Sequence, residues 1–179
     1  GVPTISNGQF KHMTALETVE LGEGVTEIKV SAGNYGAFEY LKNLKSVSLP
    51  TTLTNIGYAA FRGCTALSEI TIPEAVTSIS DYAFEGCAAL PEINIPTGVT
   101  SIGRYAFYNC VGLMEIELPE GLQTSGYYAF VGTSIETLIF PDGVTSVSVD
   151  GLTKVKHLHW PGGVPTISNG QFKHMTALE

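Results

Sequence analysis

Short stretches of alternating apolar and polar residues recur along the chain, and most of them end at a proline. The clearest stretch ends at Pro73, and its apolar members are Ile70 and Ile72. Its polar members are Glu69 and Thr71. A period of two places the isoleucines on one face of an extended strand and the polar side chains on the other. The pattern therefore predicts a short, half-buried strand that stops where the proline cannot donate a hydrogen bond.

Two more segments follow each predicted strand. The residues after the proline often include glycine, as in Thr97-Gly98, which indicates a turn with positive φ. A β-branched sequence such as Val-Thr-Ser-Ile at residues 76–79 then favours a second extended stretch. The closing sequence Tyr-Ala-Phe-x-x-Cys, as in residues 82–87, is predicted to turn the chain back as a single helical or 3₁₀ turn.

The whole pattern repeats at a fixed interval. The phenylalanines that close successive copies, from Phe38 to Phe130, are equally spaced, and alanine precedes every one of them. A fixed period in the range of about 20–29 residues predicts a solenoid, in which each coil covers the apolar face of its neighbour. The phenylalanine rings should then stack into a spine through the core. The predicted spine consists of Phe10, Phe38, Phe61, Phe84, Phe107 and Phe130.

The residues that carry the period also carry a family resemblance. The pattern L-x-x-I-x-I-P-x-x-V-T-S-I-x-x-x-A-F-x-x-C resembles the BspA-like (Treponema pallidum-type) leucine-rich repeats over essentially the whole chain. The resemblance implies a β-rich solenoid: a right-handed coil of stacked short parallel strands with short helical or 3₁₀ turns. It also implies a cell-surface protein, such as an adhesin, with no shared catalytic motif.

The two ends of the chain have the same sequence. Residues 1–17 and 163–179 both read GVPTISNGQFKHMTALE, so the sequence begins again at Gly163. The positions that end the predicted strands divide the stretch before Gly163 into seven coils. We therefore expect one solenoid over residues 1–179, with one seven-coil unit at 1–162 and the start of the next identical unit at 163–179. Neither end resembles a polar cap, which favours a segment of a longer tandem array. An engineered overlap is the alternative.

Composition and charge exclude several classes of protein. Hydrophobic residues make up 44% of the chain and charged residues 15%, which excludes a disordered protein. The formal charge of −8 would repel phosphate backbones and anionic membranes, so nucleic acid is not an expected partner. No stretch approaches the roughly 20 apolar residues that cross a bilayer, so this segment should not insert directly into a membrane.

The cysteines and histidines suggest a metal site only weakly. Cys64, Cys87 and Cys110 recur at the same interval as the phenylalanines and should stack on neighbouring coils. A disulfide ladder and a metal site are possible interpretations, but buried free thiols fit better because no C-x₂₋₄-C pair is present. His157 and His159 project from one predicted strand without an obvious third ligand. We therefore expect no metal and no cofactor.

Two alternatives concern the tyrosines and catalysis. The tyrosines that precede the spine could form a carbohydrate-stacking ladder, although covering the edge of the core fits them better. The sequence contains no G-x-S-x-G, H-E-x-x-H or P-loop motif. Packing explains the residues that conform to the repeat and leaves few unexplained polar residues from which to build a site, so the protein should not be an enzyme and catalytic residues are not expected.

The outward positions of the predicted strands form the candidate binding face. Acidic residues occupy the middle coils, and a basic and imidazole-rich stripe follows. The surface could be patterned for partners or for lateral contact between arrays; ordinary solubility charge is the alternative. The candidate residues are Glu69, Glu92, Glu115, Glu117, Glu136, Lys156, His157 and His159.

Taken together, the sequence predicts a structural repeat protein. Its tandem array would form an elongated extracellular or surface fibre, with further copies of the unit as partners end to end and in lateral self-association. The alternative is a cell-surface adhesin that binds host or matrix proteins through the strand face. Both hypotheses place the protein outside the cell or on its surface.

Overall fold

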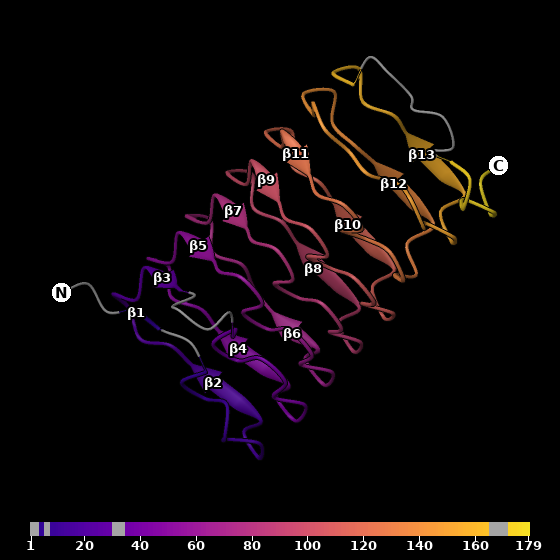
Figure 1. The fold of residues 1–179 in the computed structure, drawn as a ribbon. Helices are drawn as coiled ribbons and strands as arrows, with labels where there is room; N and C mark the ends of the chain where they lie inside the picture. The colour runs from indigo at the N-terminus through magenta and orange to yellow at the C-terminus, as the bar shows by residue number, and fades with distance from the viewer. Residues whose placement is uncertain (1–3, 6–7, 30–34, 165–171) are drawn as a thin grey trace.

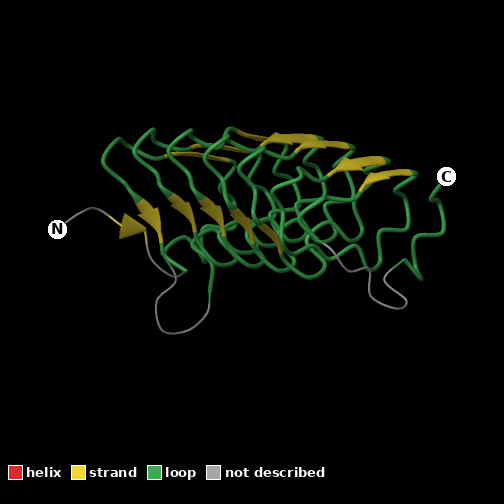
Figure 2. Cartoon of the chain, turned by 90° about the horizontal axis from the view of Figure 1, so that it is seen from above, coloured by secondary structure: helices red, strands yellow, loops and turns green. Residues whose placement is uncertain are grey.

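The computed structural model describes residues 4–5, 8–29, 35–164 and 172–179 as a stack of coils (Figure 1). Short parallel strands lie in two rows, and the described ends of the chain are at opposite ends of the stack. Turns connect the rows, and the described residues contain no helix (Figure 2). Accordingly, none of the described segments is a helix long and apolar enough to cross a membrane. The predicted fold class, a β-rich solenoid of leucine-rich-repeat type, is confirmed.

The first row contains one strand from each coil, and we call its outer surface the strand face. Inward and outward residues alternate as predicted: Ile93 is buried, whereas Glu92 and Asn94 are exposed. The strands are β2 (Thr18–Glu20), β4 (Ser46–Ser48), β6 (Glu69–Ile70), β8 (Glu92–Asn94), β10 (Glu115–Glu117), β12 (Thr137–Ile139) and β13 (His157–His159).

The first row is not continuously hydrogen bonded. It divides into the groups β2-β4-β6, β8-β10 and β12-β13. One division has a clear cause at Pro91, which occupies the place that Ser68 holds one coil earlier. The Ser68 N–H donates to the carbonyl of Lys45 at 3.0 Å. Proline has no N–H, so Pro91 cannot make the equivalent bond between β6 and β8.

The second row is a continuous six-stranded sheet in the order β1-β3-β5-β7-β9-β11. Its strands match the second extended stretch expected from the sequence, and isoleucines such as Ile79 and Ile102 point into the core. The strands are β1 (Thr4–Ile5), β3 (Glu27–Ile28), β5 (Asn55–Ile56), β7 (Ser78–Ile79), β9 (Ser101–Ile102) and β11 (Thr124–Ser125).

The Tyr-Ala-Phe segment forms hydrogen-bonded turns, and the helical or 3₁₀ turn predicted there is absent from the described residues. Alternate N–H groups donate to the next coil: Tyr82 to the carbonyl of Arg104 and Phe84 to that of Ala106, both at 2.8 Å. Gly86 donates in the same direction, and φ is +61° at Tyr82 and +72° at Gly86. In a helix these N–H groups would donate to carbonyls of the same segment. Here they donate to the next coil, so no helix forms.

The phenylalanine side chains stack through the centre of the solenoid. Successive ring centroids from Phe10 to Phe130 lie 4.7, 5.3, 5.4, 5.3 and 5.7 Å apart, with interplanar angles of 17° or less. Phe140 is tilted by 58° against Phe130, and the stack of parallel rings ends there. In the next coil Leu152 is buried near the place where the period expects a ring. The spine therefore fixes the spacing of the coils that display the strand face.

Candidate binding site on the strand face

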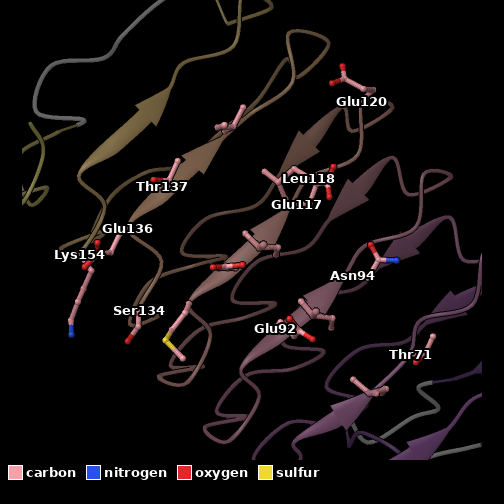
Figure 3. A pocket seen from close by; sticks show the side chains of 16 residues that line it. Thr71, Glu92, Asn94, Glu117, Leu118, Glu120, Ser134, Glu136, Thr137 and Lys154 are labelled. Carbon is pink, nitrogen blue, oxygen red and sulfur yellow. The ribbon is translucent and has the colours of Figure 1, made fainter.

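A groove of about 1120 Å³ crosses the strand face over the middle coils. Figure 3 shows Glu92 and Asn94, Glu117, and Thr137 extending from successive coils toward this groove. Inward-facing isoleucines, including Ile93 and Ile116, contribute apolar surface. A smaller hollow of about 490 Å³ lies over β2, β4 and β6. The larger groove contains most of the candidate carboxylates, so it is the better candidate site.

Three of the predicted carboxylates form a line along the strand face; Glu92 and Glu115 line the groove, and Glu69 lines the smaller hollow. Glu92 lies directly opposite Glu115 in the parallel pair of β8 and β10, and Glu69 occupies the same place in β6. All three are exposed, and within the described ranges none of them forms an ion pair. Like charges on adjacent strands destabilise the pairing. The middle of the strand face therefore carries uncompensated negative charge.

Neutralising one member of this line should stabilise the fold. Replacing Glu115 with glutamine is expected to raise the free energy of unfolding by about 0.2–1 kcal/mol at low ionic strength, because it removes the repulsion from Glu92. Urea denaturation would measure the change, and the gain should vanish in 1 M salt. The same substitution at Glu74, an exposed turn residue, is the control. Equal gains at both positions would show that repulsion between the strands is not the cause.

The predicted basic stripe is partly neutralised by its own neighbour. Lys156 Nζ lies 2.8 Å from Glu136 Oε2. The hydrogen bond from Lys156 and its charge lower the pKa of Glu136, and the same contact raises the pKa of Lys156. Glu17 and Lys45 form a similar pair at 2.8 Å. Because Lys156 is already paired with Glu136, the stripe carries less unpaired positive charge than the sequence suggests.

The two predicted histidines are exposed on either side of Leu158 in β13. His159 Nε2 lies 3.5 Å from Asp142 Oδ1. The pKa of Asp142 is lowered mainly by the hydrogen bond that the N–H of Gly162 donates to it, and also by the contact with His159. The described part of the chain contains no group of three or more histidine, cysteine, aspartate or glutamate side chains able to hold a metal ion.

Two apolar residues of the groove were not predicted from the sequence. Met114 and Ile139 line it, and each is 60% exposed. Ile139 occupies an outward strand position, equivalent to Glu117 and His159, where the alternation expects a polar side chain. An isoleucine at this outward position was the one sign in the sequence that the groove has exposed apolar surface. Together with the carboxylates, these side chains give the groove a mixed apolar and acidic surface.

The tyrosine ladder lies on the turn side, away from the groove. Successive ring centroids of Tyr58, Tyr82, Tyr105 and Tyr128 are 5.3, 4.9 and 5.2 Å apart. Tyr82 and Tyr105 are nearly parallel, with an interplanar angle of 8°, so their faces cover each other. A sugar stacks on a free ring face, which favours the interpretation that this ladder covers the edge of the core.

The three cysteines are buried free thiols, in line with the simpler interpretation from the sequence. Each Sγ donates a hydrogen bond to a backbone carbonyl; Cys64 donates to Phe38 at 3.0 Å, and Cys110 to Phe84 at 3.0 Å. Burial raises the pKa of both thiols to about 12. Burial likewise raises the pKa of Cys87. These groups are therefore protonated core residues at neutral pH.

Comparison with known proteins identifies the class. The family described as BspA type leucine rich repeat region matches residues 33–159 in six copies, and the chain belongs to this family. Leucine-rich-repeat families are non-enzymatic structural and binding scaffolds. A comparison with curated proteins finds no match.

Solved structures share the architecture. The leucine-rich repeat protein of T. pallidum is 26% identical with a TM-score of 0.81, and the alignment covers 98% of this chain and 82% of that one. A leucine rich cell surface protein from Faecalibacterium prausnitzii is 24% identical with a TM-score of 0.59, over 97% and 61% of the two chains. A leucine-rich repeat protein from Eubacterium ventriosum is 21% identical with a TM-score of 0.53, over 92% and 53%. The last two show the fold alone.

Proposed function

We propose that this chain is a segment of a tandem leucine-rich-repeat array that forms an elongated extracellular or surface fibre. The observation that carries the proposal is the seam where the repeated sequence begins again. Residues 172–179 pack on the coil that contains β13, and Met175 is only 6% exposed there. Phe172 contacts Trp160 with ring centroids 5.5 Å apart. The start of a second unit thus finds a complementary surface at the end of the first.

The seam uses the same hydrogen bond as the interior coils. The N–H of Glu179 donates to the carbonyl of Lys156 at 2.9 Å. At the equivalent place between the first two coils, the N–H of Lys45 donates to the carbonyl of Glu17 at 2.7 Å. The repeated segment therefore continues the register of the solenoid. Such continuity allows units to follow one another without a new kind of contact.

A two-unit chain tests the array. In a protein with residues 1–162 placed before the full 179 residues, the seam should couple the units, because each coil stabilises its neighbour. We expect one unfolding transition at a higher urea concentration than the 179-residue chain shows. Small-angle scattering should give a particle longer by about 34 Å, from seven strand spacings of about 4.8 Å. Independent unfolding at the original midpoint would contradict the proposal.

A second candidate function is adhesion through the strand face. The groove combines the exposed apolar side chains of Met114 and Ile139 with the unpaired carboxylates of Glu92 and Glu115. This surface suits a host or matrix protein that presents basic and apolar residues. The F. prausnitzii structural neighbour is described as a cell surface protein, which supports a location where such partners occur.

Charge reversal in the groove tests the adhesin. Replacing Glu92 and Glu115 together with lysine should abolish binding to a panel of immobilised matrix proteins, because both substitutions repel a basic partner. Surface plasmon resonance would measure the binding, which should also weaken as salt increases. Glu74→Lys reverses one charge on an exposed turn away from the groove and is the matched control for each of the single reversals, Glu92→Lys and Glu115→Lys. Binding that survives the double reversal would exclude this face.

A further inference from the structure

The turns that precede the phenylalanine spine form a second surface, separate from the strand face. We call residues 58–59, 81–82, 104–105 and 127–128 the tyrosine face, because five of its eight residues are tyrosines. Its most exposed tyrosine is Tyr127, at 61%. Tyrosine and arginine are enriched where proteins contact one another. The composition of this surface is therefore that of a protein interface.

Three of these tyrosines adopt a backbone conformation that suits glycine better. The angle φ is +61° at Tyr82, +57° at Tyr105 and +59° at Tyr128. A residue with a side chain is strained at positive φ, whereas glycine is not. The ring faces cover one another in the ladder, and all three residues remain half-buried. A partner that covers the outer edges of the rings would offset the strain.

Two charged residues at the centre of the tyrosine face have no ionic partner. Asp81 and Arg104 hold the same place on neighbouring coils, yet among the described residues neither forms an ion pair. Asp81 Oδ1 instead accepts a hydrogen bond from the backbone N–H of Arg104 at 2.7 Å. The guanidinium carbon of Arg104 lies 5.9 Å from the ring centroid of Tyr127. The centre thus offers one charge of each sign.

The order of residues along this face is self-complementary. One column reads Tyr58, Asp81, Arg104 and Tyr127, with equal steps between coils that the paired strands β5, β7, β9 and β11 keep in register. If the same column of a second copy is reversed and laid face to face on the first, Asp81 falls opposite Arg104. Tyr58 then falls opposite Tyr127. Opposite charges and aromatic rings therefore meet in the same alignment.

We propose that the tyrosine face joins two solenoids side by side and antiparallel, about a two-fold axis midway between Asp81 and Arg104. The partner is a second copy of this chain. Because a two-fold axis makes every contact in duplicate, the pair contains two ion pairs between aspartate and arginine. This side-to-side contact goes beyond the end-to-end array proposed above and does not depend on it.

The neighbouring column of the face fits the same axis. It reads Ala59, Tyr82, Tyr105 and Tyr128. Reversal places Tyr82 opposite Tyr105, and it places the large side chain of Tyr128 opposite the small one of Ala59. A parallel pair with its axis along the stack would instead place Asp81 opposite its own copy. Facing like charges disfavour that arrangement, so charge selects the antiparallel one.

Exchanging the two charges tests the pairing. Arg104→Asp places a carboxylate opposite Asp81 of the other copy, so the dissociation constant of the dimer should rise at least about tenfold at low ionic strength. Asp81→Arg should have the same effect, because two guanidinium groups then face each other. The two substitutions combined in one chain restore opposite charges and should restore the dimer. Sedimentation equilibrium measures the dissociation constants.

Two further variants separate charge from the aromatic contact. Tyr127→Asp should weaken the dimer to a similar extent, because it replaces an exposed ring with a carboxylate opposite Tyr58. Glu74→Lys reverses one acidic charge on an exposed turn outside the tyrosine face, so it is the matched control for Asp81→Arg and should leave the dimer unchanged. Circular dichroism and thermal unfolding check that each variant retains the fold.

Each result decides the proposal. A parent chain that stays monomeric at about 100 μM, or a dimer that survives Arg104→Asp or Tyr127→Asp, would overturn it. A folded double variant that remains monomeric would do the same. If Asp81→Arg fails to fold, because it loses the hydrogen bond from the N–H of Arg104, the other two variants still decide. If the dimer is absent while the two-unit chain unfolds in one stabilised transition, the tandem array stands and only the side-to-side contact is discarded.

Discussion

Replacing Phe84 with alanine is expected to lower the free energy of unfolding by about 3–5 kcal/mol, the usual cost of removing a buried phenylalanine ring. Phe84 is fully buried and stacks between Phe61 and Phe107 at 5.4 and 5.3 Å. Its loss leaves a cavity that two coils share. Equilibrium urea denaturation of the 179-residue chain measures the effect.

Val111→Ala is the matched control for this ring, because Val111 lies one coil away and is exposed. Its substitution should change the free energy of unfolding by no more than about 0.5 kcal/mol. A loss below about 1 kcal/mol for Phe84→Ala would show that the coils collapse into the cavity. The spine would then not set the spacing of the solenoid.

Raising the pH above 9 is expected to destabilise the protein steeply. The ordinary pKa of a cysteine thiol is 9.0, and burial raises the pKa of Cys64 and Cys110 to about 12 in the folded protein. Cys87 shifts in the same direction. The unfolded chain therefore loses these protons first, so the stabilisation is complete below pH 9 and decreases above it. Between pH 8 and pH 10 each thiol should lose about 1.4 kcal/mol of stabilisation in total, and the three together about 4, because the unfolded thiols are only half ionised at pH 9.

Urea denaturation between pH 8 and pH 10 would measure this loss, mostly below the range in which tyrosines ionise. Cys110→Ala serves as the control, because it should remove about one third of the pH dependence whatever it does to stability at pH 7. Retention of the full loss in that variant would assign the alkaline effect to other groups.

The repeating parts of the fold were predictable because they follow from local pattern. Alternation placed Ile70 and Ile72 inside, and the constant period predicted the stacked rings. The single helical or 3₁₀ turn predicted for each Tyr-Ala-Phe segment is a hydrogen-bonded turn in the described residues. Nothing in one copy of Tyr-Ala-Phe reveals that the N–H of Tyr82 is used by the next coil, or that this tyrosine adopts a φ of +61°. Hydrogen bonding between coils decided that conformation.

The candidate site was predictable only in outline. The outward positions of Glu92 and Glu115 followed from alternation, and their direct opposition follows from the constant coil length between them. The pairing of Lys156 with Glu136 depends on the shorter coils near the C-terminal end, so it required the structure. The apolar contribution of Met114 and Ile139 was overlooked because a pattern of charges alone does not reveal exposed apolar side chains.

Pro91 has a mechanical consequence for the solenoid. Between β6 and β8 the strand face lacks a hydrogen-bonded ladder, whereas β7 and β9 remain paired on the other row. A load that stretches the strand face meets no ladder at this junction, while the opposite row holds and should act as a hinge. A fibre of such units would therefore flex in one preferred direction at the Pro91 junction of every unit, and its bending stiffness would vary periodically along the filament.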